Sequence, residues 1–272
     1  MIFTRRRPPG FSRLVLWRLL ALSPLFLALT REAKASPSPP DYASFVCWDY
    51  SHLPSMRAWR ETGDIIAATL SGSYPALPQI RRQENGSPAQ LKDFLRQLPD
   101  DPNRITVVYL AAHQSPGGQW HFTDRSVASW ESLLDGLPRL RNIRRIVLLD
   151  CCYAQAASLW PGWSEKIAPA CIYASPQNCP TPDLFAFRRR PVDCQALFPH
   201  AFQWLKQRRS DDDERVSFFG LVWLETWLSQ PQPPQSLVDW RQFGQRMTLL
   251  ARKAATQIRA GESSEIISVF SG

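Results

Sequence analysis

The sequence has no Cys-x-x-Cys pair, and its four histidines show no His-x-x-x-His spacing. Those are spacings of common zinc sites and of thioredoxin-like redox motifs, so neither a structural metal nor a thiol redox protein is favoured. No repeat with a period of about 20 to 50 residues occurs, which argues against a solenoid or propeller. We therefore expect no metal ion and no cofactor.

A long apolar run is also missing. The longest stretch in the leader covers residues 19–29, whereas a bilayer-spanning helix needs about 20 apolar residues. Basic residues at positions 5–7 precede this stretch, and a small-x-small site at residues 33–35 follows it. This is the layout of a secretory signal peptide. We expect a secreted or periplasmic protein, and an uncleaved leader anchored in the membrane is the alternative.

The positive charge is concentrated in the same leader. The chain has a net charge of +8, but residues 1–35 hold seven of the 32 basic residues and one of the 24 acidic ones. The rest of the chain is close to neutral, so no nucleic-acid partner is expected. We predict a signal peptide over 1–35, a Pro-rich linker over 36–42, and one folded domain over 43–272.

Six cysteines occur in the chain, and an exported protein meets an oxidising compartment where disulfides form. Cys171, Cys179 and Cys194 lie close together in sequence and are candidates for pairing. The adjacent residues Cys151 and Cys152 could also join in a vicinal disulfide, which would silence a nucleophile there.

Short apolar runs alternate with helical patterns along the body of the chain. Ser87 and Gln90 form a capping-box pattern with Pro88 in the first turn, which predicts a helix beginning there. A buried strand over 105–110, helical spacing from Trp130 to Leu137 and a strand over 146–149 follow. Further strands are predicted over residues 43–48 and 170–174, and further helices over 54–70, 223–228 and 240–250.

The order of strand, helix and strand makes a crossover unit, which forces the two strands to run parallel. The predicted fold is therefore an α/β domain with an open, mostly parallel sheet flanked by helices. Ligands of such sheets gather at the carboxyl ends of the strands. His113 and Cys152 each lie just past such an end, and a thiol beside an imidazole is the minimal pair of a cysteine peptidase.

The residues that end these strands resemble a known group. Residues 107–113 look like the histidine strand of the caspase and hemoglobinase superfamily, and residues 146–152 look like its cysteine strand. Metacaspases are the nearest match, and legumains the second. The resemblance implies a caspase-like α/β/α sandwich, Cys152 as the nucleophile and His113 as the acid/base. It also implies that Asp150 binds an Arg or Lys side chain of the substrate.

The chain departs from the superfamily pattern at two places. Gly usually follows the histidine, and its N–H helps to bind the oxyanion, but this chain has Gln114. A Gly-containing turn usually follows the nucleophile, where this chain continues with Tyr153 and Ala154. The backbone N–H groups of Gln114 and Cys152 are still the oxyanion donors that the resemblance implies.

Each candidate also has a purely structural interpretation. Cys152 can be a small apolar residue at a strand end, His113 a hydrogen-bonded histidine near a turn, and Asp150 a cap or strand-end acceptor. His121 is an alternative base, although its neighbours Trp120 and Phe122 indicate a hairpin packed on the sheet edge.

We therefore expect an exported cysteine endopeptidase, or a related transpeptidase, that acts on a peptide or protein substrate. The main alternative is a catalytically inactive caspase-like module that binds a peptide or protein without cleaving it.

Overall fold

The computed structural model describes residues 39–74, 79–175, 195–208, 216–258 and 266–270. The leader predicted over 1–35 and the candidate disulfide partners Cys179 and Cys194 lie outside these residues. Among the described residues, no helix is both long and apolar enough to span a membrane.

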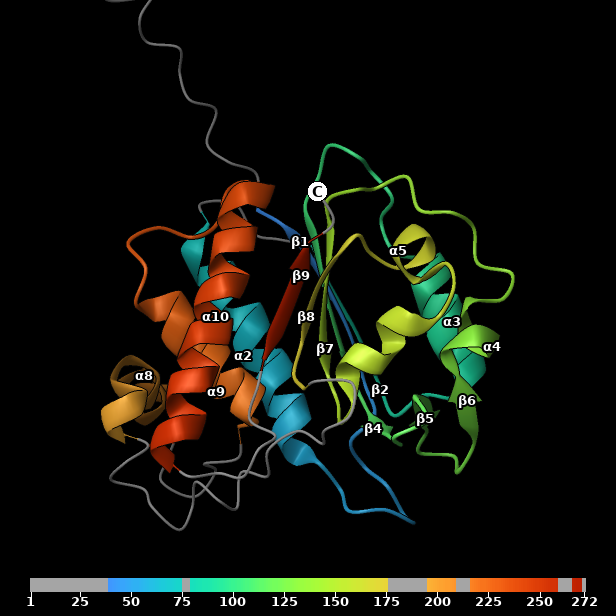
Figure 1. Cartoon of the computed structure of the whole chain (residues 1–272), viewed down its shortest axis with the longest axis horizontal. Coiled ribbons are helices and arrows are strands. Elements are labelled where there is room, and N and C mark those ends of the chain that lie inside the picture. The colour runs from blue at the N-terminus through green and yellow to red at the C-terminus, as the bar shows by residue number, and fades with distance from the viewer. Residues whose placement is uncertain (1–38, 75–78, 176–194, 209–215, 259–265, 271–272) are drawn as a thin grey trace, which may run out of the picture. The chain divides into compact units, whose positions relative to one another are not determined.

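A six-stranded sheet forms the centre of the domain, in the order β2-β1-β3-β7-β8-β9 (Figure 1). The first five strands run parallel and β9 pairs antiparallel with β8. This confirms the open, mostly parallel α/β sheet. The strands are β1 (Asp41–Val46), β2 (Ile80–Glu84), β3 (Thr106–Ala111), β7 (Arg145–Asp150), β8 (Ala170–Tyr173) and β9 (Ile267–Phe270).

Burial explains which strands the sequence predicts. Every residue of β1, β3 and β7 is buried, because both faces of these central strands are covered. The edge strand β2 instead alternates between exposed and half-buried residues. Its sequence, Ile-Arg-Arg-Gln-Glu, lacks an apolar run, so β2 was not predicted.

Helices cover both faces of the sheet (Figure 1). One group packs together on one face, where α2 contacts α9, and α9 contacts α8 and α10. The other face is covered by shorter helices, which connect successive strands along the chain. The first group is α2 (Arg57–Ser73), α8 (Pro199–Arg208), α9 (Phe218–Leu228) and α10 (Leu237–Ile258). The second group is α3 (Pro88–Arg96), α4 (Trp130–Leu134), α5 (Trp163–Lys166) and the 3-10 helix η1 (Ala154–Leu159).

Helix starts follow local hydrogen bonds. The capping box of α3 is confirmed, because the Gln90 N–H donates to Ser87 Oγ at 3.3 Å and the Ser87 N–H to Gln90 Oε1 at 2.8 Å. The helix expected around residues 54–70 is confirmed, but it begins at Arg57, which leaves Pro54 in the preceding loop. The expected helix over 130–137 ends early at Leu134.

A small antiparallel sheet follows β3. It consists of β4 (His113–Gln114), β5 (Gln119–His121) and β6 (Val127–Ser129). Trp120 and Phe122 are fully buried, which confirms the predicted packed hairpin around His121. Because only Ala112 separates β3 from β4, His113 is part of this hairpin and lies next to the edge of the large sheet.

Candidate active site

The carboxyl edge of the parallel sheet brings the ends of β3 and β7 together. The two strands are direct neighbours, and the last pair of their ladder joins Ala111 to Asp150. His113 lies two residues beyond Ala111, and Cys152 two residues beyond Asp150. Both predicted catalytic residues therefore leave the same edge of the sheet from adjacent strands, which lie about 5 Å apart.

The His113 ring is held in one tautomer. Its Nε2 atom lies 2.9 Å from the Pro54 carbonyl oxygen. A carbonyl only accepts, so Nε2 carries the proton and a neutral ring presents Nδ1 as a proton acceptor. The ring centroid lies 4.8 Å from that of Tyr50 and 5.0 Å from that of Trp59. The Tyr50 hydroxyl also accepts the His113 backbone N–H at 3.2 Å, so the residue is fixed on several sides.

Electrostatics keep this ring uncharged. Burial lowers the pKa of His113 from its usual 6.5, and the neighbouring His121 and His52 lower it further. The hydrogen bond to Pro54 opposes the shift because it favours the charged ring. At neutral pH His113 is therefore in the form that can take a proton from a thiol.

Cys152 is partly buried in the turn that follows β7. The next residue, Tyr153, has a φ of 54° and a left-handed backbone, which few residues other than glycine adopt. Ser175 secures the same turn, since its Oγ accepts the Ala154 N–H at 3.0 Å and donates to the Cys151 carbonyl at 3.1 Å. An unusual backbone held by several contacts is a common feature of functional sites.

The described cysteines are all thiols, so Cys151 and Cys152 are not joined in a vicinal disulfide. Burial raises the pKa of Cys151 well above its usual value, and the neighbouring Cys152 and Asp150 raise it further. Cys151 is therefore a poor nucleophile, because the thiolate is the reactive form. Cys171 is also a buried thiol, with its Sγ 3.3 Å from the indole nitrogen of Trp163.

Gln114 joins the histidine strand to the turn after Cys152. Its Nε2 donates to the Tyr153 carbonyl at 2.8 Å, and its Oε1 accepts from Trp120 Nε1 at 2.7 Å. In the β4–β5 ladder Gln114 faces Trp120, while the adjacent Ser115 N–H donates to the Gln119 carbonyl. Hydrogen-bonded and non-bonded pairs alternate in antiparallel ladders. The Gln114 N–H therefore points away from β5.

Asp150 points to the face of the sheet covered by α9. Its Oδ2 accepts from the Tyr109 hydroxyl at 2.8 Å and from Ser217 Oγ at 2.7 Å. Ser217 also caps α9 by accepting the Gly220 N–H at 3.0 Å. Among the described residues no side chain meets the distance and angle of a regular hydrogen bond to Oδ1, although Trp59 lies near the carboxyl. The side chain has no exposed surface, so this structure does not place it in contact with solvent.

Burial raises the pKa of Asp150 to about 6, against hydrogen bonds from Ser217, Tyr109 and Trp59 that lower it. Trp59 thus lies near Asp150 while its ring packs on His113. A carboxyl that titrates near neutral pH beside a candidate base is typical of functional sites, although buried structural networks show the same shift.

His121, the alternative base, lies directly opposite His113 in the β4–β5 ladder. Burial lowers its pKa, and the neighbouring His52 lowers it further. It comes from β5 and not from the strand beside β7, so it is one strand further from the end that carries Cys152. The geometry favours His113 over His121 as the partner of the thiol.

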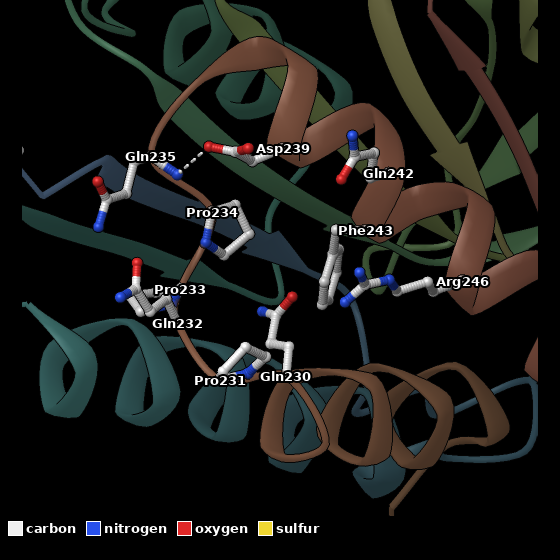
Figure 2. A pocket seen from close by; sticks show the side chains of 10 residues that line it. All are labelled: Gln230, Pro231, Gln232, Pro233, Pro234, Gln235, Asp239, Gln242, Phe243 and Arg246. Atoms are coloured by element: carbon white, nitrogen blue, oxygen red, sulfur yellow. Dashed lines mark hydrogen bonds between the residues drawn. The ribbon is translucent and has the colours of Figure 1, made fainter.

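A pocket of about 210 Å³ lies elsewhere, between the loop that joins α9 to α10 and the first half of α10 (Figure 2). It includes Arg246, Phe243 and three prolines of that loop. Tyr74, just past the end of α2, donates a hydrogen bond to the Pro234 carbonyl. Because α2 runs back from the carboxyl edge, this pocket lies at the opposite edge of the sheet. None of the candidate catalytic residues lines it.

Sequence reasoning missed the residues that orient the candidates. Pro54 acts through its carbonyl, which every residue carries, so no sequence signal marks it. Ser175 and Ser217 approach from elements that follow β7 in the chain. The side-chain bond of Gln114 was also missed, because the resemblance concerns only its backbone.

Within the described residues, no group of three or more His, Cys, Asp or Glu side chains is placed to hold a metal ion. No family model matches the chain. A search of curated proteins likewise finds no matching sequence.

Proposed function

We propose that this protein is a caspase-like cysteine peptidase with Cys152 as nucleophile and His113 as acid/base. The observation that carries the proposal is the bond from His113 Nε2 to the Pro54 carbonyl. It leaves Nδ1 as the acceptor, on a residue that leaves the sheet beside the strand of Cys152. A nucleophile, a base and a third group that orients the base form the general arrangement of covalent catalysis.

The chemistry follows from these roles. The Cys152 thiol gives its proton to His113 Nδ1, and the thiolate attacks the carbonyl carbon of the peptide bond. The tetrahedral oxyanion accepts hydrogen bonds from the backbone N–H groups of Cys152 and Gln114. Protonated His113 then gives the proton to the departing amine as the carbon–nitrogen bond breaks. Water, deprotonated by His113, hydrolyses the thioester and regenerates the thiol.

The direction of the Gln114 N–H supports its role as an oxyanion donor. The β4–β5 ladder does not use this N–H, because Gln114 and Trp120 are a non-hydrogen-bonded pair. Replacement of glycine by Gln114 therefore keeps a donor at this position. Removal of one such donor in other enzymes lowers the rate by about 100 to 1000-fold.

Asp150 is the candidate for selecting an Arg or Lys side chain of the substrate. Its buried carboxyl supports this role, since a cation would compensate the negative charge that burial makes costly. Its complete burial means that the substrate must reach the carboxyl past the residues packed around it, including Tyr109 and Ser217. The preference for basic substrates is thus a finer proposal than peptide-bond cleavage.

A second candidate function is a peptide- or protein-binding module that does not cleave. The departures from the superfamily pattern favour it, because Gln114 stands where the pattern has glycine and Tyr153 replaces part of a glycine-containing turn. In that case the same strand ends would bind a peptide, and replacement of His113 or Cys152 by Ala would leave the binding intact.

Hydrolysis of fluorogenic peptides with Arg, Lys, Asn or Asp before the cleaved bond tests the proposal. The reduced protein is compared with Cys152→Ala and Cys151→Ala. Turnover lost in Cys152→Ala and retained in Cys151→Ala supports the proposal, and equal turnover in all three rejects Cys152. If none turns over and an electrophilic peptide probe does not label Cys152, the binding module is favoured.

Export of the protein is a separate proposal, supported by the basic, apolar and small-x-small pattern of residues 1–35. Amino-terminal sequencing of the mature protein from a fractionated host tests it. A chain that begins at Ser36 supports cleavage of the leader, and a chain that retains residues 1–35 in the membrane fraction supports the anchored alternative.

A further inference from the structure

One hydrogen bond joins the two places at which the chain departs from the superfamily pattern. Gln114 takes the place of the glycine after the histidine, and Tyr153 takes the place of residues in a glycine-containing turn after the nucleophile. The Gln114 carboxamide nitrogen donates to the Tyr153 carbonyl at 2.8 Å. The two departures are therefore physically coupled across 39 positions of the chain.

Tyr153 needs this support because of its backbone conformation. Its φ of 54° lies in the left-handed region, which glycine enters freely and residues with a Cβ enter against steric resistance. Such a conformation persists only where the surroundings determine it. Loss of the support would free the peptide that joins Tyr153 to Ala154, whose carbonyl Gln114 holds, and with it the turn after Cys152.

The orientation of the Gln114 carboxamide follows from its partners. Oε1 faces the Nε1–H of Trp120 at 2.7 Å and that of Trp130 at 3.4 Å. Indole N–H groups only donate and the Tyr153 carbonyl only accepts, so a flipped amide would lose all three bonds. The nitrogen is therefore the atom that faces Tyr153. The buried Cys151 Sγ, 3.4 Å from Oε1, adds a further contact.

Ser175 holds the same turn from the other flank. Its Oγ accepts the Ala154 N–H at 3.0 Å, and its carbonyl accepts the Gln155 N–H at 3.2 Å. With Gln114 on β4 and Ser175 just past β8, the turn is secured to elements on both sides of β7. Hydrogen exchange at the amides of Ala154 and Gln155 therefore reports whether the turn keeps this conformation.

We propose that the Gln114 side chain is a positioning residue that holds the Cys152–Tyr153 turn in its left-handed conformation. It thereby takes over the role that glycine plays in the superfamily pattern. Gln114 thereby connects the two proposed oxyanion donors. Its own backbone N–H is one of them, and its side chain holds the turn that follows the other, the N–H of Cys152. The catalytic part of this inference rests on the proposed peptidase function; the hold on the turn does not.

A double-mutant cycle tests the coupling. Gln114→Met keeps the volume of the side chain and removes its hydrogen bonds, whereas Tyr153→Gly removes the steric resistance. We expect Gln114→Met to lower kcat by about 100-fold, as for a misplaced catalytic group, and to change KM by less than about 3-fold. In the Tyr153→Gly background the same substitution should lower kcat by less than about 10-fold. Equal losses in both backgrounds would overturn the coupling.

Trp120→Phe is the matched control. It removes one partner of Oε1 and leaves the bond to Tyr153, with Trp130 still facing Oε1. We expect a lower Tm and a change in kcat of less than about 3-fold. A loss of kcat in Trp120→Phe as large as in Gln114→Met would overturn a specific role for the bond to Tyr153.

Amide hydrogen exchange gives a readout that needs no turnover. In Gln114→Met the amides of Ala154 and Gln155 should exchange at least about 10-fold faster, and Tyr153→Gly should reverse most of this effect. Unchanged exchange would overturn the hold on the turn. Faster exchange with unchanged kcat would overturn the positioning role. If the unmodified protein lacks turnover while exchange responds as expected, the peptidase proposal fails and the hold on the turn stands.

Discussion

His113 and Pro54 are joined by a hydrogen bond of 2.9 Å, from the ring nitrogen Nε2 to the backbone carbonyl, although 59 positions separate them in the chain. The bond fixes which nitrogen carries the proton. It also connects the loop after β1 to the end of β3, so His113 is oriented by an element outside its own strand. The choice of tautomer, and with it the availability of Nδ1, is a consequence of tertiary structure.

Replacement of His113 by Ala should lower kcat/KM for peptide hydrolysis by about 100 to 10000-fold, because general acid/base catalysis is lost. His121→Ala removes the other candidate base and should retain turnover. Steady-state kinetics on both variants make the comparison. A loss confined to His121→Ala would reassign the base to β5.

The pH dependence of kcat/KM should place its acid limb below pH 6.5. Burial lowers the pKa of His113 from that value, so the neutral ring persists as the pH falls through 6.5 and is lost only at lower pH. A profile measured on the unmodified protein checks this. An acid limb well above pH 6.5 would mean that another group controls the reaction.

Asp150→Asn should stabilise the fold in a pH-dependent way. The folded-state pKa of Asp150 is raised from 3.8 to about 6, so the folded protein binds this proton more tightly than the unfolded chain. The contribution of this protonated carboxyl to the free energy of unfolding is fully present below pH 3.8 and is lost as the pH rises through 6. At pH 7 the ionised carboxyl therefore costs about 3 kcal/mol, which the amide avoids.

The difference in free energy of unfolding between Asp150→Asn and the unmodified protein should accordingly grow between pH 4 and pH 7 by up to about 3 kcal/mol. Urea denaturation at both pH values measures it. A difference that does not vary with pH would show that Asp150 is not protonated preferentially in the folded state.

Ser175→Ala should destabilise the domain by about 1 to 3 kcal/mol, because the Ala154 N–H loses its buried acceptor. Turnover should fall with it, since the turn after Cys152 loses one of its supports. Ser158→Ala, in the exposed part of η1, loses the bonds of that hydroxyl to the Gln155 carbonyl and to Tyr173 but leaves the Ala154 N–H its acceptor, so it serves as the control. Similar losses of stability in both variants would contradict a special role for Ser175.

The parts of the fold that follow from sequence are those with a local physical cause. Apolar runs predict β3 and β7 because both faces of these strands are buried. The α3 helix begins at Pro88 because the cap formed by Ser87 and Gln90 is complete within four residues. The polar edge strand β2 has no such signal. The strand β9 has an apolar sequence, but its antiparallel pairing with β8, which lies far away in the chain, has no local cause.

The candidate site divides in the same way. The sequence by itself determined that His113 and Cys152 end successive strands of a crossover unit, which obliges the two strands to be parallel. Tertiary structure alone decided that Pro54 orients the His113 ring, that Ser217 binds Asp150, and that Gln114 reaches Tyr153. Periodicity and capping record contacts between residues near in sequence. These hydrogen bonds join distant positions, and their partners are fixed only when the chain packs.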